Sequence, residues 1–244
     1  MASEPFVRPS PERLSWYIAP SDITDRSANP IGRGGLDSVF TGTYLGSKVA
    51  IKQLLDTCST HQLNEYHHDI DLWQKLSHPN VLSLLGACDR DDDGNPIPPF
   101  MVSPFMPNGT LRDHVSDPAT PVSLGEKLRL LRQVAAGMVY LHEHNVAHGD
   151  LKAANVLLDG GVNAVISDFG LSRIKHTSVS IDSHAAKSQT DGSLDNRTPK
   201  TLADERPAES SRAADIHAFG ILMYEVLNDG KPVWATGDAQ ARHV

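Results

Sequence analysis

Four short motifs, in a fixed order along the chain, hold residue types suited to phosphate chemistry. The first is a glycine-rich turn at residues 32–35 (GRGG), followed by Val39. Glycines let backbone N–H groups approach phosphate oxygens with no Cβ in the way. The second is the alternating strand 49–52 (VAIK), which carries a single lysine. Each of these two is a weak signal alone, because glycine-rich hairpins and solvent-facing strand lysines also occur in proteins with other functions.

The third and fourth motifs are far more specific. Residues 148–155 (HGDLKAAN) match the catalytic-loop pattern H-R-D-L-x-x-x-N at every position except the arginine, where Gly149 stands. Residues 168–170 (DFG) follow at the spacing that this pattern requires. The order of the four motifs therefore carries more weight than any one of them.

Strand-forming segments must position the first two motifs. Residues 31–46 predict a hairpin, and 48–54 alternate as a third strand. Residues 60–76 follow a helical period, and the apolar runs at 81–88 and 100–105 suit further buried segments. The first half of the chain is therefore expected to form a small sheet with one helix.

Helical signals dominate the second half. A capping box at residues 123–126 opens an apolar helical period that continues to Leu141. A strand-turn-strand at 156–166 separates the third motif from the fourth. Residues 171–202 hold ten Ser and Thr and predict a long mobile loop, whereas 215–227 predict an apolar helix.

With these motifs the sequence resembles the protein kinase superfamily, from about Pro30 to Trp234, and in particular the tyrosine-kinase-like group of Ser/Thr kinases. The resemblance implies an α+β, bilobal kinase fold, with a β-rich N-lobe and a mainly helical C-lobe that lacks its last helices. The expected division is a Pro- and Ser-rich leader at 1–25 and a kinase domain at 26–244. Within that domain, 26–106 would be the N-lobe and hinge and 107–244 a partial C-lobe. In the leader, residues 16–18 (WYI) are the expected anchor.

The resemblance also implies a role for individual residues. Asp150 would accept the proton of the substrate hydroxyl, and Lys152 would neutralise charge on the transferred group. Asn155 and Asp168 would hold Mg²⁺ through oxygen ligands, which this hard cation prefers. Asp215 would anchor the catalytic loop. The residues expected to bind ATP are Ile31, Gly32, Gly34, Val39, Ala50, Lys52, Asp69, Pro104, Met106, Asn155 and Asp168.

Three positions depart from the family pattern. Asp69 stands where a helix glutamate should pair with Lys52, and its side chain is shorter by about 1.3 Å of reach. Asp37 replaces the third glycine of the phosphate loop, and its charge would repel phosphates unless it points away. Gly149 replaces an arginine that normally pairs with a phosphate on the activation loop. These departures, with the missing helices, put catalytic activity in question.

Composition limits the other classes of function. The net charge is −8 at pH 7, which argues against nucleic-acid binding. The two cysteines form no metal-binding or disulfide pattern, so a reducing compartment is expected. The sequence shows no signal peptide and no apolar stretch approaching the ~20 residues of a membrane span. A cytoplasmic location is therefore expected.

The predicted function is a protein serine/threonine kinase that uses ATP and Mg²⁺ and acts on a protein substrate with a Ser or Thr acceptor. The Thr198-Pro199 pair supports this acceptor. Two alternatives remain at this point. The chain could be a pseudokinase that binds nucleotide or a partner with little catalysis, or a fragment that does not fold alone.

Overall fold

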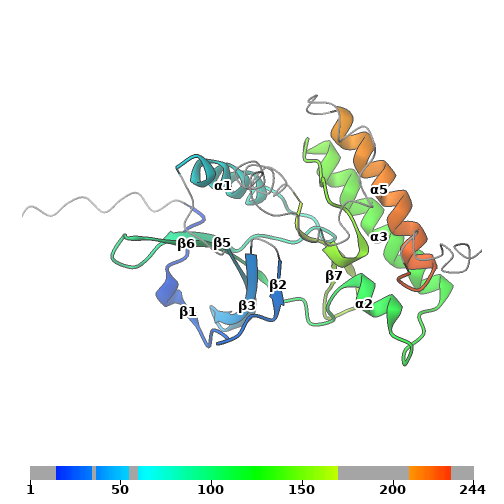
Figure 1. Cartoon of the computed structure of the whole chain (residues 1–244), viewed down its shortest axis with the longest axis horizontal. Helices are drawn as coiled ribbons and strands as arrows, with labels where there is room; N and C mark the ends of the chain where they lie inside the picture. Colours follow the sequence, from blue (N-terminus) through cyan, green and yellow to red (C-terminus); the bar gives the residue numbers. More distant parts are fainter. Residues whose placement is uncertain (1–14, 35–36, 55–59, 170–208, 232–244) are drawn as a thin grey trace, which may run out of the picture.

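The elements form two lobes joined by a single extended linker after residue 104 (Figure 1). The computed structural model describes residues 15–34, 37–54, 60–169 and 209–231. A sheet with one helix makes up the first lobe, and helices with a small hairpin make up the second (Figure 1). The expectation of an α+β, two-lobed fold is confirmed.

Antiparallel strands form the sheet of the first lobe, in the order β1-β3-β4-β6-β5, with β2 paired to β3. The strands are β1 (Ile23–Thr24), β2 (Gly32–Arg33), β3 (Asp37–Tyr44), β4 (Ser47–Leu54), β5 (Gly86–Arg90) and β6 (Pro96–Pro104). Leu45 and Gly46 both have positive φ, so they form the tight turn that suits a two-residue hairpin between β3 and β4. The predicted hairpin and third strand are confirmed.

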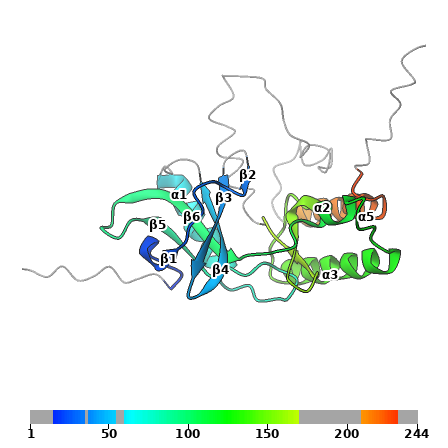
Figure 2. The same ribbon diagram turned by 90° about the horizontal axis from the view of Figure 1, so that it is seen from below.

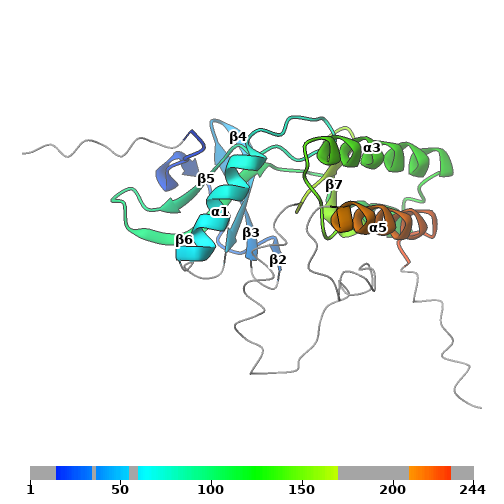
Figure 3. The same ribbon diagram turned by 90° about the horizontal axis from the view of Figure 1, so that it is seen from above.

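Helix α1 (Thr60–Trp73) packs on the sheet through buried Tyr66, Ile70 and Trp73 (Figure 3). The Tyr66 hydroxyl donates to the carbonyl of Phe100 on β6 at 2.7 Å. The helix was expected to run to residue 76, but its regular part ends at Trp73 and the next three residues form a turn.

The segment before the sheet is held against β5 and α1. Ile18 donates its backbone N–H to Ala87, and Ala87 donates to the carbonyl of Trp16. The Trp16 ring is 3% exposed, and its Nε1 donates to Asp71 of α1 at 3.0 Å. A short 3₁₀ turn, η1 (Pro20–Asp22), leads from here into β1. The expected anchor at residues 16–18 is confirmed.

The second lobe is built on two helices that lie side by side, α3 (Leu124–Glu143) and α5 (Glu209–Leu227) (Figures 2 and 3). Its other elements are α2 (Leu111–Ser116), η2 (Ala153–Asn155), β7 (Val156–Leu158) and β8 (Ala164–Ile166). The Ser123 side chain caps α3 by accepting from the backbone N–H of Glu126. Buried Leu130, Val134 and Leu222 belong to a core that continues into the first lobe.

The strand-turn-strand at 156–166 and the start of α3 agree with the sequence expectations. Two helices differ. The short α2 was not predicted, and α5 begins six residues before the expected start at Asp215. The apolar side chains of Ile216 and Leu227 on α5 are exposed. The loop expected at 171–202 and the Thr198-Pro199 pair lie outside the described residues.

Candidate active site

The glycine turn is shaped around the side chain of Asp37. The backbone N–H of Gly34 donates to the carbonyl of Asp37 at 2.8 Å, which joins the residue after β2 to the first residue of β3. A Cβ on Gly34 would lie 2.5 Å from Oδ1 of Asp37, closer than real Cβ contacts come. Glycine at position 34 therefore allows the Asp37 carboxylate to lie against the turn.

Strand register places the expected nucleotide-binding side chains on one face of the sheet. Val39 pairs with Lys52 across β3 and β4, and Ala50 pairs with Ser103 across β4 and β6. Because side chains alternate along a strand, Val39, Ala50 and Lys52 share a face. The opposite face carries Val49 and Ile51, which belong to a separate apolar core.

Lys52 lies between two carboxylates. Its Nζ pairs with the carboxylate of Asp168 and also lies 3.4 Å from Oδ2 of Asp37. Burial alone would lower the pKa of Lys52, but the charges of Asp168 and Asp37 outweigh it and raise that pKa above its usual value. Among the described residues, no ion pair joins Lys52 to Asp69 of α1.

The catalytic-loop motif forms a compact hydrogen-bonded group. Nδ2 of Asn155 donates to the backbone carbonyl of Asp150 at 2.7 Å and to its Oδ2 at 3.2 Å. Nζ of Lys152 lies 3.4 Å from the same carboxylate oxygen. The Asp150 carboxylate is therefore contacted by the amide of Asn155 and by the ammonium group of Lys152, and these two contacts hold it in place.

Asp215 fixes the backbone of this loop from α5. Its carboxylate is 1% exposed and accepts from the N–H groups of His148 at 2.8 Å and Gly149 at 2.9 Å. His142 of α3 lies 2.8 Å from Oδ2 of the same carboxylate. Gly149 has φ 79°, a conformation that glycine adopts without strain. The predicted anchoring role of Asp215 is confirmed.

A serine links the catalytic loop to the fourth motif. The backbone N–H and the hydroxyl of Ser167 both donate to the carbonyl of Asn155 at 2.9 Å. This contact brings the two expected metal ligands, Asn155 and Asp168, onto adjoining segments. Asp168 itself has φ 60°, an uncommon conformation for a residue other than glycine.

Aromatic packing connects the fourth motif with α1. The rings of Phe169 and Trp73 meet edge to face with centroids 5.3 Å apart. Nε1 of Trp73 donates to the carbonyl of Leu82, which fixes the ring.

Burial lowers the pKa of His148, which is fully enclosed behind the catalytic loop. The neutral imidazole accepts from the backbone N–H of Asp150 at Nδ1.

The remaining expected nucleotide contacts lie around the linker and the glycine turn. Pro104 ends β6 opposite Val49, and Met106 follows in the linker. Ile31 precedes the turn and is largely exposed.

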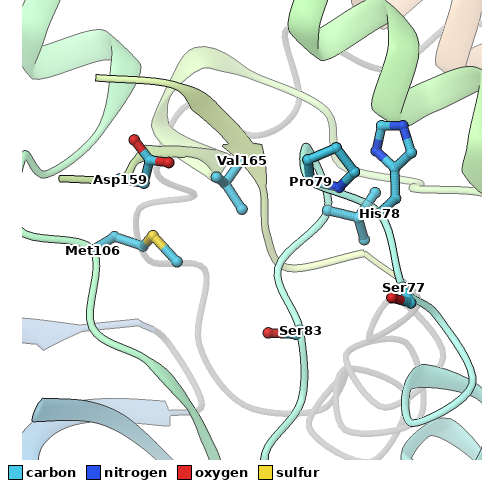
Figure 4. A pocket seen from close by; sticks show the side chains of 8 residues that line it. Ser77, His78, Pro79, Ser83, Met106, Asp159 and Val165 are labelled. Atoms are coloured by element: carbon cyan, nitrogen blue, oxygen red, sulfur yellow. The ribbon is translucent and has the colours of Figure 1, made fainter. Parts of the chain in front are cut away.

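Met106 also borders a pocket of about 370 Å³ together with His78, Asp159 and Val165 (Figure 4). Lys52, Asp150 and Asp168 do not line this pocket, so it is separate from the place where the motifs meet.

Sequence reasoning missed a second support for the catalytic loop. Glu225 of α5 accepts from the backbone N–H of Ala153 at 3.3 Å and pairs with Arg112 of α2 at 3.2 Å. The signal that could have revealed it is a single acid within the otherwise apolar run at 218–227. His142 was likewise not assigned to Asp215.

Comparison with known proteins agrees with this geometry. A family profile described as protein tyrosine and serine/threonine kinase matches residues 26–242. The probable serine/threonine-protein kinase drkD of Dictyostelium discoideum is 32% identical over 217 residues, which cover 88% of this chain and 16% of that protein.

Two relatives from Arabidopsis thaliana show similar likeness. U-box domain-containing protein 33 is 31% identical, over 83% of this chain and 23% of its own length. A probable LRR receptor-like serine/threonine-protein kinase is 33% identical, over 88% of this chain and 22% of its own length. The chain thus spans less than a quarter of each of these three relatives.

Proposed function

Because the chain belongs to the protein tyrosine and serine/threonine kinase family, we propose that it is a protein serine/threonine kinase. It would transfer the γ-phosphate of ATP to a serine or threonine hydroxyl of a protein substrate. The observation that supports this most is the network that joins Asp150, Asn155 and Ser167 beside Asp168. Phosphoryl transfer depends mainly on positioning and on charge stabilisation, and this network supplies the positioning.

Two residues of the loop have chemical roles in the proposal. The Asp150 carboxylate accepts the proton of the attacking hydroxyl, and Lys152 places its positive charge at the transferred group. Lys152 and Asn155 hold the same oxygen of Asp150, so the carboxylate is fixed before a substrate arrives. A base held in place contributes typically 10²–10⁴-fold to a rate, as an order of magnitude.

The donor set fits a hard divalent cation. Asn155 directs its amide hydrogens to Asp150, which turns its side-chain oxygen to other partners, and Asp168 contributes a carboxylate. Oxygen ligands of this kind suit Mg²⁺, which supplies positive charge at phosphate oxygens when it is bound. Lys52 would hold the α- and β-phosphates on the sheet side of the same site.

The nucleotide would lie against the sheet face that carries Val39 and Ala50, with its adenine edge at the linker residues Pro104 and Met106. Ile31, Gly32 and Gly34 would cover it from the glycine turn. The division of the chain into a leader at 1–25 and a kinase domain at 26–244 belongs to the same proposal. The family match over 26–242 is its main support.

The alternative of a pseudokinase is not favoured, because the matched relatives include several named as serine/threonine kinases.

No helix in the described part of the chain is long and apolar enough to cross a membrane. The cytoplasmic location and the absence of nucleic-acid binding stay predictions from the sequence.

A thermal melt with and without Mg·ATP, followed by a transfer assay with radiolabelled ATP, tests the proposal. Binding to the native state should stabilise it by about 2.7 kcal/mol at a hundredfold excess over Kd. Label should then appear on serine or threonine of a general protein substrate. An upward shift of the melt without any transfer would contradict kinase activity, and label on tyrosine alone would contradict the acceptor.

A further inference from the structure

Asp37 lies in the phosphate loop, yet its side chain is turned to Lys52. Val39 stands directly opposite Lys52 in the β3–β4 register, and Asp37 is two residues before Val39, on the same face. Its Oδ2 lies 3.4 Å from Nζ of Lys52. The two side chains are 14% and 16% exposed, so water screens their attraction only in part.

Gly34 leaves room for the Asp37 side chain to point to Lys52. The carboxylate rests against the Cα of Gly34, where a Cβ would come within 2.5 Å of Oδ1. The hydrogen bond from Gly34 N–H to Asp37 C=O closes the backbone around it. Glycine at position 34 therefore leaves room for the inward direction of Asp37, and the ion pair with Lys52 favours it.

In the described part of the chain, the acid on helix α1 does not pair with Lys52 as Asp37 does. Asp69 on α1 stands where the family resemblance predicts the partner of Lys52, but the described residues hold no ion pair between them. Asp168, the other partner of Lys52, is also an expected metal ligand. Asp37 is then the carboxylate that can stay with the lysine when Asp168 is engaged by a cation.

We propose that Asp37 is a positioning residue that holds Lys52 for its contact with the nucleotide phosphates, in place of the helix acid. The inference rests on the proposed function, because that function gives Lys52 its role. The acid was expected to repel phosphates unless it points away, and here its side chain points to Lys52. Restoring glycine there, as in the family pattern, should weaken the enzyme.

A double-mutant cycle tests the pairing without any need for activity. The free energy of unfolding is measured by urea denaturation for Asp37→Asn, Asp69→Asn and Lys52→Met, and for each aspartate change combined with Lys52→Met. Asp37→Asn should raise the unfolding equilibrium constant about fivefold when Lys52 is present and much less in the Lys52→Met background. Asp69→Asn should change the unfolding equilibrium constant by the same factor with Lys52 present and in the Lys52→Met background. Coupling of Asp69 to Lys52, or its absence for Asp37, would overturn the proposal.

Kinetics then separate positioning from a structural effect. Asp37→Asn should lower kcat about tenfold or more, because a displaced lysine meets the phosphates poorly. KM for ATP should change less, since the same substitution also removes a negative charge near the phosphates. Asp37→Glu should recover part of kcat, and Asp37→Gly should not.

Asp93→Asn, in the exposed turn between β5 and β6, is the matched control and should keep the wild-type rate. A kcat that rises in Asp37→Asn would mean that the acid repels the phosphates and would overturn the proposal. A wild-type chain without any phosphate transfer would contradict the proposed function instead, and the unfolding cycle would still decide whether Asp37 holds Lys52.

Discussion

The Asp215 carboxylate organises the catalytic loop through three contacts at once. It accepts two backbone N–H groups and meets the ring of His142, with almost no exposure to water. Each buried N–H that loses its acceptor costs the desolvation of that group. The geometry at Asp150 therefore depends on a residue that touches no substrate.

Asp215→Asn should lower the free energy of unfolding by about 1–3 kcal/mol, because an amide can replace only one of the two accepting oxygens. Phosphate transfer should fall with it as the loop backbone loosens. Urea denaturation and a transfer assay measure the two effects. Stability and rate both equal to those of the Asp93→Asn control would contradict the anchoring role.

His148 gives the stability a dependence on pH. Burial lowers its pKa in the folded chain, whereas the unfolded chain has the ordinary value of about 6.5. Below the unfolded value the unfolded state binds a proton that the folded state refuses, so acid favours unfolding. Stability should therefore fall as the pH drops from 6.5 towards the lowered pKa.

His148→Asn tests this origin, because its side-chain oxygen can still accept from the Asp150 N–H but does not titrate. The slope of the free energy of unfolding between pH 7 and 5 should be smaller in the variant by up to about 1.4 kcal/mol per pH unit. Unfolding midpoints across that range measure it. An equal slope in both proteins would assign the acid sensitivity to other groups.

At the scale of elements, α3 is placed by a glycine that helix propensity alone would disfavour. A Cβ on Gly137 would lie 2.6 Å from the carbonyl oxygen of Asn80 and 2.7 Å from Ile166 of β8. The helix therefore approaches the segment after α1 and the hairpin more closely than any other residue would allow.

Gly137→Ala and Gly125→Ala make a matched pair within α3. Alanine is the better helix former by about 1 kcal/mol in a helix interior, and a Cβ on Gly125 would make only an ordinary contact, 3.9 Å from Oγ of Ser123, so Gly125→Ala should leave stability unchanged or higher. Gly137→Ala should lower it, because backbone atoms of the neighbouring segment must move. Thermal unfolding of both variants checks the contrast, and a stabilising Gly137→Ala would refute the close approach.

The segment that precedes β1 contributes to the first lobe through Trp16. Replacing the buried ring by alanine should cost about 3–5 kcal/mol and loosen α1, whose Asp71 accepts the indole N–H. Ser15→Ala, which removes an exposed hydrogen bond to Gln74, serves as the control and should have little effect. If the alanine variant of Trp16 and the Ser15→Ala control had equal free energies of unfolding in denaturant, the segment would not be part of the folded lobe.

Elements with strong local signals could be predicted from the sequence. The hairpin of β7 and β8 consists of two short apolar runs around a glycine turn, and its bounds agree with the prediction. The short α2 has too few turns for a periodic signal, and it depends on Thr110, which caps it, and on packing against distant residues. Helix α1 ends at Trp73, whose ring donates to the carbonyl of Leu82, a contact that the helical period does not predict.

For the whole molecule, the site forms where the two lobes meet. The order of the motifs predicts which residues gather there, because each motif belongs to a fixed place in the family fold. The partner of Lys52 could not be predicted in this way, since Asp37 and Asp69 are both acids and only strand register decides between them. The Glu225 contact also joins residues that are 72 positions apart.

The proposed role of the Asp150 carboxylate as the base of phosphoryl transfer is tested by the rate of Asp150→Asn. With Mg·ATP and a serine/threonine substrate, kcat should fall roughly 10²–10⁴-fold. The upward thermal shift with Mg·ATP should be retained, and Asp93→Asn should match the wild type. A wild-type rate in Asp150→Asn would show that this carboxylate is not the base.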